Sequence, residues 1–271
     1  MQKLRSINDY LKSPFTDITP LLELALQKSH AWLITHTNSM LSNTEKTTLD
    51  ALIKQRQNGT PFAYLSGKKG FYHLDFKVTP DTLIPRPETE LLIDIALDLF
   101  KNKPCTLLDL GTGSGVIAVT LADKNPHWQV TATDFSIDAL RVAKKNATTT
   151  INFQQGSWFE AVPNQTFDFI ISNPPYIKEE DEHLINLRYE PISALTSGKD
   201  GLKDIKIIIN QAPTYLNTQG FLLLEHGYNQ QEAIIDLLKK NFTDIQTFKD
   251  YNSNNRAIMA QLKINTRGEE K

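Results

Sequence analysis

The sequence predicts an α/β fold: a mostly parallel sheet with helices on both faces, preceded by a small helical bundle. Beyond about residue 104, short apolar segments alternate with amphipathic ones, a pattern that implies βαβ units. Only helical periodicity is visible in the first 65 or so residues. Between these regions, residues 70–83 alternate loosely around Phe71, Phe76 and Val78, which predicts a β-hairpin connector. The expected divisions are a bundle at 1–68, a hairpin linker at 69–86 and an α/β domain at 87–271.

Composition excludes several classes of protein. The 271 residues suit one large domain or two unequal ones, and a net charge of −2 gives no basic footprint for tight nucleic-acid binding. A single cysteine, Cys105, excludes an internal disulfide and a cysteine-based metal site, and the six histidines show no metal-ligand spacing. The amino terminus lacks the apolar core of a signal peptide, and no apolar run is long enough to span a membrane. We therefore expect a soluble, cytoplasmic protein in which Cys105 is a small buried residue.

Three helices are predicted in the bundle. Thr19-Pro20 indicates a helix start with proline in the first helical position, and the apolar residues from Leu21 to Leu33 follow one stripe. A second helix is expected at 44–57, and Gly59, just beyond it, is the signal that ends it. Thr60-Pro61 opens a short third helix that closes near Gly67.

The α/β domain begins at Pro87, and the segment from Leu83 to Glu90 leads into a helix that carries Leu91, Leu92 and Ile95. The alternation predicts the following strands and helices, in chain order: strand 106–110, helix 116–124, strand 129–133, helix 137–147, strand 151–155, strand 167–172, helix 202–216, strand 221–224, helix 230–240 and closing strands 245–249 and 257–261.

A glycine-rich turn joins the first of these strands to its helix. It spans Asp109 to Gly115, and its glycines let the backbone turn sharply and approach a ligand closely. A dinucleotide fingerprint would need glycine where Val116 stands, and a phosphate-binding P-loop would need a lysine that is absent. The remaining common interpretation is the D-x-G-x-G-x-G loop of S-adenosylmethionine methyltransferases. A tight turn without a ligand is the alternative.

Two later residues complete this candidate cofactor site. Asp134 ends the second strand, where a carboxylate can accept both ribose hydroxyls or can cap the following helix at Ser136. Trp158 follows the third strand, where it can line an adenine pocket or simply fill the core.

The segment Asn173-Pro174-Pro175-Tyr176 follows an apolar strand that ends in Ser172. Neither proline can donate a ladder hydrogen bond, so the strand stops in a stiff loop at the edge where open α/β sheets bind ligands. Asn173 offers a carbonyl acceptor and an NH2 donor, and Tyr176 adds a flat ring. This combination suits a grip on a planar amino or amide nitrogen.

Together these residues resemble the HemK/PrmC family of protein-glutamine N5-methyltransferases. The resemblance runs from about residue 59 to 261, and Asn-Pro-Pro-Tyr alone is shared with DNA adenine and RNA guanine methyltransferases. The matching segments are Gly59-x-Pro61-x-x-Tyr64-x-x-Gly67, Phe71, Ile84-Pro85-Arg86-Pro87-Glu88-Thr89-Glu90, Asp109 to Gly115, Asn173 to Tyr176, Tyr189-Glu190-Pro191, Gly198-x-Asp200-Gly201-Leu202, Glu225-x-Gly227 and Arg256.

The resemblance implies a class I, Rossmann-like methyltransferase domain with a seven-stranded sheet and S-adenosylmethionine as cofactor. It implies that Gly111, Thr112, Gly113, Ser114 and Gly115 cradle the cofactor. In the same way, Asp134 would hold the ribose, Trp158 would border the adenine, and Asn173 would lie between cofactor and substrate. Asn173, Pro174, Pro175 and Tyr176 would bind the target glutamine, with Asn173, Pro174 and Tyr176 serving catalysis. No metal is implied.

The implied substrate is the Gly-Gly-Gln glutamine of class I peptide release factors, recognised by a monomer through its helical bundle. A ribosomal-protein glutamine methyltransferase, a DNA or RNA amino-methyltransferase and a binding protein with a vestigial cofactor fold are the alternatives. The roles of Arg86, Glu90 and Glu190 stay open: Arg86 can enter the cleft or pair with a carboxylate, Glu90 can be a first-turn helix acid, and Glu190 can shape the substrate opening.

Overall fold

The structure is a computed structural model that describes residues 6–101 and 103–264. It divides the chain into two compact units between Gly67 and Lys68. The first five residues of the predicted bundle and the last seven of the predicted α/β domain lie outside the described residues.

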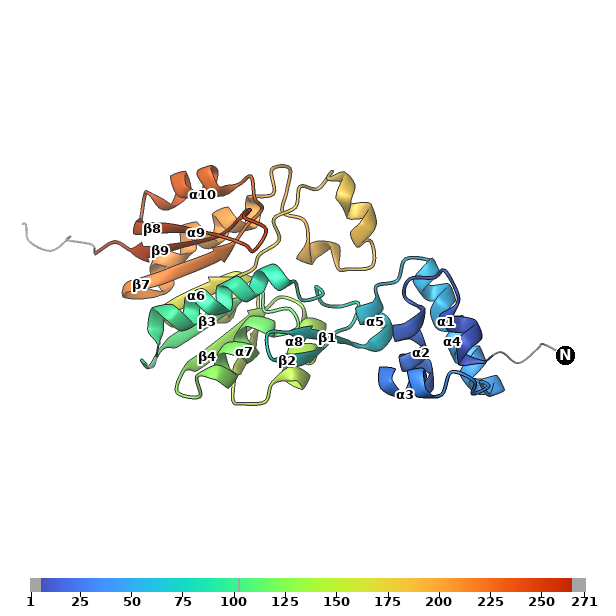
Figure 1. The fold of residues 1–271 in the computed structure, drawn as a ribbon. Helices are drawn as coiled ribbons and strands as arrows, with labels where there is room; N and C mark the ends of the chain where they lie inside the picture. The colour runs from blue at the N-terminus through green and yellow to red at the C-terminus, as the bar shows by residue number, and fades with distance from the viewer. Residues whose placement is uncertain (1–5, 102, 265–271) are drawn as a thin grey trace, which may run out of the picture. The chain divides into compact units, whose positions relative to one another are not determined.

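The first unit is helical and has its own apolar core (Figure 1). Leu21, Leu22, Leu33 and Leu49 are fully buried there. Ser42 and Glu45 form a capping box that starts the longest helix of the unit. Its helices are α1 (Ile7–Leu11), α2 (Ile18–Leu26), α3 (His30–Thr35), α4 (Asn43–Gln57) and α5 (Phe62–Ser66).

The prediction of one helix from Pro20 through Leu33 is wrong. Helix α2 begins at Ile18, and the chain leaves it at Gln27, which has left-handed backbone angles with φ 53°. Ser29 then starts α3, because its side chain accepts a hydrogen bond from the backbone N–H of Trp32. The apolar stripe therefore spans two helices around one core, which periodicity alone does not distinguish from a single helix.

The second unit contains the hairpin and the α/β domain (Figure 1). Its elements are β1 (Lys68–Phe71), β2 (Leu74–Lys77), η1 (Pro87–Thr89), α6 (Glu90–Phe100), β3 (Thr106–Leu110), α7 (Val116–Lys124), β4 (Gln129–Asp134), α8 (Ile137–Asn146), β5 (Asn152–Gln155), η2 (Trp158–Ala161), β6 (Phe167–Ser172), η3 (Glu182–Leu187), η4 (Ile192–Ala194), α9 (Lys203–Tyr215), β7 (Leu216–Glu225), α10 (Gln231–Leu238), β8 (Phe242–Lys249) and β9 (Asn255–Leu262), where η marks a 3-10 helix.

The main sheet has seven strands in the order β5-β4-β3-β6-β7-β9-β8. Strands β5, β4, β3, β6 and β7 run parallel, and β9 pairs antiparallel with both β7 and β8. This confirms the predicted fold class. Strand β7 is longer than expected, because it begins directly after α9 at Leu216 instead of near Phe221.

Each face of the sheet carries its own apolar core, as alternation along the strands requires. Leu107 and Phe169 point into the core that α6 and α7 cover, whereas Leu108 and Ile170 point into the core that α9 and α10 cover. Cys105 is buried in the first core, as expected, and burial raises the pKa of its thiol.

The hairpin β1–β2 packs onto the α/β part of its unit. Phe71 and Phe76 are buried in the core beneath α6 and α7. Asn146, the last residue of α8, accepts a hydrogen bond from the backbone N–H of Lys77 and donates one to its carbonyl, at 2.8 and 2.9 Å. The hairpin is therefore held in two ways: by the burial of Phe71 and Phe76 and by the hydrogen bonds between the Lys77 backbone and Asn146.

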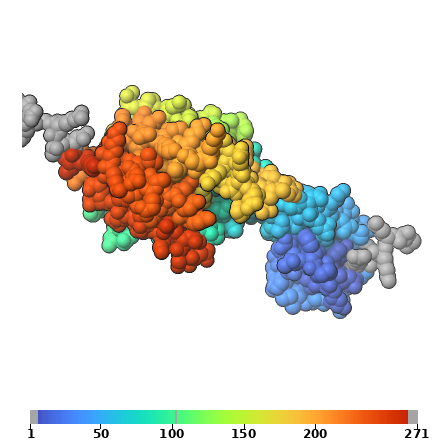
Figure 2. Space-filling model, turned by 90° about the horizontal axis from the view of Figure 1, so that it is seen from above, coloured from blue at the N-terminus to red at the C-terminus, as the bar shows by residue number. Residues whose placement is uncertain are grey.

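The strand order places a ligand site between β3 and β6. The chain goes from β3 outward to β4 and β5, then returns to β6 on the other side of β3. Open α/β sheets bind ligands at the carboxyl ends of the strands where the order reverses in this way. Here those ends carry the glycine turn and the Asn173 loop, and residues 177–202 follow as an irregular surface segment, yellow to orange in Figure 2.

Candidate active site

The glycine turn is built for close backbone approach. Gly111, Gly113 and Gly115 all have positive φ angles, of 70°, 56° and 86°. A Cβ on Gly111 would lie 3.4 Å from the ring of Trp158, so the absence of a side chain lets this indole cover the turn. A Cβ on Gly115 would lie 3.1 Å from that of Ala143, so this glycine serves the packing of α7 against α8.

Asp109 and Thr112 stabilise the glycine turn from its buried side. The hydroxyl of Thr112 donates to Asp109 Oδ2 at 2.6 Å, and the backbone N–H of Ala118 donates to the same oxygen at 3.2 Å. Asp109 is fully buried, its Oδ1 has no partner, and burial raises its pKa to about 7. These contacts connect the end of β3 to the first turn of α7.

Asp134 contacts both the glycine turn and the next helix. Its Oδ2 accepts from the backbone N–H of Gly113 and its Oδ1 from that of Ser136, each at 2.9 Å. Burial raises its pKa, and these N–H donors act in the opposite direction. The N-cap of α8 is Ser136, whose hydroxyl accepts from the backbone N–H of Ala139, so Asp134 is not the cap itself but holds the N–H of the capping residue. Each of its carboxylate oxygens keeps a second lone pair that a ligand could use.

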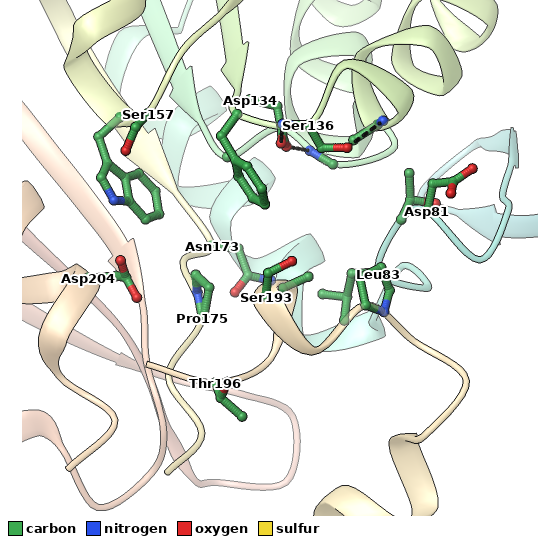
Figure 3. A pocket seen from close by; sticks show the side chains of 18 of the residues that line it. Asp81, Leu83, Asp134, Ser136, Ser157, Asn173, Pro175, Ser193, Thr196 and Asp204 are labelled. Carbon is green, nitrogen blue, oxygen red and sulfur yellow. Dashed lines mark hydrogen bonds between the residues drawn. The ribbon is translucent and has the colours of Figure 1, made fainter. Parts of the chain in front are cut away.

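A cavity of about 510 Å³ opens above these residues. Figure 3 shows Asp134 and Ser136 on one side of it and Asn173 and Pro175 across from them. Of the residues that the sequence assigns to the cofactor, those lining the cavity are Gly111, Gly113, Asp134, Trp158 and Asn173. Thr112, Ser114 and Gly115 do not line it; Thr112 and Ser114 are buried behind the turn.

A second cavity, of about 320 Å³, lies on the other side of Asn173. Pro174 and Tyr176 line this second cavity, whereas Pro175 lines the first. Asn173 lines both, and so do Leu83 and Ala194. The loop after β6 therefore forms part of the partition between two cavities, with the Asn173 amide at the junction.

Hydrogen bonds link this amide to a buried carboxylate. Asn173 Nδ2 donates to Thr89 Oγ1 at 3.0 Å, and Thr89 Oγ1 donates to Glu225 Oε2 at 2.7 Å. The hydroxyl of Tyr176 donates to Glu225 Oε1 at 3.1 Å. Arg256 lies beside them, with Nη1 3.4 Å from the Tyr176 hydroxyl. Glu225 is fully buried at the end of β7.

Arg86, Glu190 and Glu90 have distinct partners. Arg86 Nη2 lies 2.5 Å from Glu190 Oε1, while Glu190 Oε2 accepts from the backbone N–H of Ile84 at 2.9 Å. Arg86 also lines the second cavity, so it both faces that cavity and pairs with a carboxylate. Glu90 lines neither cavity and accepts from the backbone N–H of Tyr72 in the hairpin turn.

Within residues 6–101 and 103–264, no group of three or more His, Cys, Asp or Glu side chains is placed to hold a metal ion. No helix in the same part of the chain is long and apolar enough to cross a membrane.

Curated relatives match this chain over nearly their full length. A release factor glutamine methyltransferase from Coxiella burnetii is 43% identical over 256 residues, which cover 92% of each chain. The protein of the same name from Escherichia coli is 39% identical over 257 residues, covering 92% of this chain and 93% of that one. The chain belongs to the release factor glutamine methyltransferase family.

Two family models match this methyltransferase in separate regions. The PrmC N-terminal domain matches residues 2–67, and the Methyltransferase small domain matches residues 88–189. A methyltransferase from Pyrococcus furiosus, with a TM-score of 0.56 and 20% identity over 79% of this chain and 98% of that one, shares the fold. So does the Thermus thermophilus 16S rRNA N2 G1207 methyltransferase, with a TM-score of 0.55 and 17% identity over 72% of this chain and 50% of that one.

Sequence reasoning missed the part that Thr89 plays in this methyltransferase. A threonine at the start of a helix is usually explained as a cap, yet Thr89 makes no side-chain cap bond to α6. Glu225 and Arg256 were included only as parts of the family resemblance. No local signal connects Thr89, Asn173 and Glu225, because 84 and 136 residues separate Thr89 from its two partners.

Proposed function

We propose that this enzyme transfers the methyl group of S-adenosylmethionine to the side-chain amide nitrogen of a release-factor glutamine. The names of the relatives indicate a release-factor glutamine as the substrate. We assign it to the Gly-Gly-Gln segment of class I factors, as the family resemblance implies. The observation that carries the proposal is the position of Asn173 at the junction of two cavities, one on the side of the glycine turn and one on the side of Tyr176.

The first cavity fits S-adenosylmethionine. Backbone without side chains at Gly111 and Gly113 gives room for close approach, Asp134 offers carboxylate lone pairs for ribose hydroxyls, and the indole of Trp158 offers an apolar face for adenine. When bound, the cofactor supplies a methyl group activated on a sulfonium. Thr112, Ser114 and Gly115 are assigned to shaping the turn from behind.

The second cavity suits the glutamine side chain. Asn173 Oδ1 and the carbonyl of Pro174 each accept one N–H of the substrate amide, which orients its nitrogen toward the first cavity. The two acceptors also stabilise positive charge as it develops on that nitrogen. Tyr176 forms a further wall of this cavity, with its ring held by its hydroxyl bond to Glu225, whereas Pro175 faces the first cavity.

In the transfer, the amide nitrogen would bond the methyl carbon as the carbon–sulfur bond breaks. The sulfur would leave as a neutral thioether, and one amide proton would pass to water. A strong base is not needed before the transfer, since the alkylated nitrogen is acidic. Alignment of the two reactants supplies on the order of 7–11 kcal/mol of the barrier. The main task of the site is therefore to hold the two reactants in line, and proton transfer by a side chain is secondary.

We assign partner recognition to the helical unit, residues 1–68, and catalysis to residues 87–271, with the hairpin 69–86 between them. A single glutamine loop offers little surface for selecting one protein, so a second contact surface is expected. The enzyme is expected to act as a monomer in the cytoplasm, where its substrate works, without direct nucleic-acid contact.

The decisive experiment is transfer of a labelled methyl group from S-adenosylmethionine to purified release factors, followed by peptide mass mapping. Label on the glutamine of Gly-Gly-Gln supports the proposal. Label on a ribosomal-protein glutamine or on naked nucleic acid instead, with none on release factors, would replace it with the corresponding alternative.

A further inference from the structure

The hydroxyl of Thr89 is used in an unexpected way. Thr89 joins η1 to α6 and is 2% exposed. Its hydroxyl bonds Asn173 and Glu225 instead of capping the helix that it begins. A buried hydroxyl that bonds residues of the candidate active site, and not its own helix, suggests that Thr89 has a role in that site.

The count of hydrogens determines how the Asn173 amide is oriented. A threonine hydroxyl has one hydrogen, and an ionised carboxylate can only accept. While Glu225 is ionised, Thr89 gives its hydrogen to Glu225 Oε2 at 2.7 Å and can only accept from Asn173. The Asn173 atom facing Thr89, 3.0 Å away, must therefore be the NH2 group. The other branch of the amide, the carbonyl Oδ1, is left as the acceptor.

The same carboxylate holds the second polar side chain of the loop. Glu225 Oε1 accepts from the hydroxyl of Tyr176 at 3.1 Å. One buried group at the end of β7 thus positions both Asn173, through Thr89, and Tyr176 directly. A flipped Asn173 would instead present N–H donors to a substrate amide that itself offers N–H donors.

We propose that Thr89 and Glu225 are positioning residues that fix the Asn173 amide with its carbonyl oxygen toward the substrate nitrogen. The inference rests on the proposed function, because it concerns the acceptor needed for a glutamine amide. Thr89 lines neither cavity, whereas Glu225 lines the second one. In this proposal the reacting amide is contacted by Asn173 and Pro174, not by Thr89 or Glu225.

The charge of Glu225 makes this arrangement sensitive to pH. Burial raises the pKa of Glu225 to about 7 and the nearby Glu88 adds to this, whereas Thr89, Arg256 and Tyr176 act in the opposite direction. His226 is the next residue, and its own pKa is lowered by burial. Once protonated, Glu225 can donate to Thr89, which frees the Thr89 hydrogen for Asn173 and permits the flipped amide. Turnover should therefore fall as the pH decreases through about 7.

The first test compares Thr89→Val, which keeps the shape and removes the hydroxyl, with Thr89→Ser, which keeps the hydroxyl. We expect kcat on a Gly-Gly-Gln peptide to fall by about 10- to 100-fold in Thr89→Val and to recover to within a fewfold in Thr89→Ser. Affinity for S-adenosylmethionine, measured by calorimetry, should stay unchanged in both. Thr120→Val removes another fully buried hydroxyl, on α7, and should keep wild-type kcat.

A kcat for Thr89→Val within twofold of wild type would overturn the proposal. Equal loss in Thr89→Ser and Thr89→Val would also overturn it, since the hydroxyl would then not be the active feature. Thermal unfolding of each variant shows whether the protein is folded, and Glu225→Gln provides an independent variant if Thr89→Val is not.

The second test is the pH dependence of kcat for wild type and Glu225→Gln. A neutral amide at position 225 both donates and accepts at every pH, so Glu225→Gln should be slower at pH 8 and should lack the decline near pH 7. The same decline in both proteins would overturn the assignment to Glu225. Wild-type protein that leaves the glutamine of intact release factors unmethylated at every pH would overturn the proposed function itself, whereas normal methylation with unaffected variants overturns only the positioning.

Discussion

The amide of Asn173 is held at its nitrogen end by Thr89, which leaves its oxygen as an acceptor at the junction of two cavities. Neighbouring residues of the same loop alternate between the cavities: Pro174 and Tyr176 face one, Pro175 the other. The rigidity of two consecutive prolines makes this alternation stable. A four-residue segment can thus serve cofactor and substrate at once.

Removal of the Asn173 side chain should affect transfer more than cofactor binding. For Asn173→Ala we expect methyl transfer to decrease by on the order of 10²-fold or more, because one of the two acceptors for the substrate amide is lost. Calorimetry should show S-adenosylmethionine affinity close to that of wild type. Asn252→Ala, in the exposed turn between β8 and β9, is the matched control. Near-normal turnover in folded Asn173→Ala would contradict the assignment.

Substitution of Gly111 should lower both the stability of the protein and its affinity for S-adenosylmethionine, and a control variant can separate these two effects. In Gly111→Ala, the alanine backbone would have to keep a φ of 70°, and its Cβ would lie 3.4 Å from the Trp158 ring at the wall of the first cavity. We expect a loss of about 1–2 kcal/mol in the free energy of unfolding and a weaker affinity for S-adenosylmethionine. Gly67→Ala has a similar φ of 69° with no atom within 4 Å, far along the chain from the glycine turn. It should lose comparable stability, measured by urea unfolding, with unchanged affinity; equal affinities in both variants would refute the role of Gly111.

At the scale of elements, the connection from β3 to α7 depends on a buried carboxyl group. The Asp109 side chain is fully buried, and its Oδ2 accepts hydrogen bonds from Thr112 and from the first turn of α7. Its Oδ1 has no hydrogen-bond partner among the described residues. The folded state therefore holds a proton more tightly than the unfolded chain does, because burial disfavours the charged form.

This predicts a specific dependence of stability on pH. The pKa of Asp109 rises from 3.8 in the unfolded chain to about 7 in the folded protein, so between these values the folded state binds more protons. The free energy of unfolding should then fall as pH rises, by up to about 1.4 kcal/mol per pH unit for this group. Asp109→Asn should remove that part of the slope, as measured by urea unfolding at pH 5, 6 and 7. Identical slopes in the two proteins would contradict the prediction; the slope from Glu225, which has the same sign, stays in both.

The elements also show where sequence patterns succeed. The strands β3, β4 and β6 were predicted within about one residue, because each is a short buried apolar run; glycine follows β3, and a proline pair follows β6 after Asn173. The break at Gln27 and the start of β7 at Leu216 were missed, since tertiary packing sets both. Boundaries of this kind have no strong local signal.

At the scale of the whole molecule, two units have separate apolar cores. Residues between Ile7 and Leu65 form the core of the helical unit, and all residues of the other two cores follow Lys68. Each unit therefore has its own source of stability. This separation supports division of labour between partner recognition and catalysis.

Deletion of residues 1–67 tests that division. We expect KM for an intact release factor to rise much more than KM for a short Gly-Gly-Gln peptide, because the peptide needs only the catalytic unit. Circular dichroism and S-adenosylmethionine binding establish that the remaining unit is folded. Equal changes in the two KM values would assign no recognition role to the helical unit.

The fold class, the glycine turn after β3 and the Asn173-to-Tyr176 loop could be predicted from the sequence, because each depends on local periodicity or on residues with unusual backbone properties. Which of these residues share a cavity, and which of Thr112, Ser114 and Gly115 face away from it, follows from the folded arrangement, as do the bonds from Thr89 to Asn173 and Glu225. Those contacts join residues up to 136 positions apart. Their hydrogen bonds exist only once β6, β7 and the start of α6 are brought together by the sheet, so no local pattern could contain them.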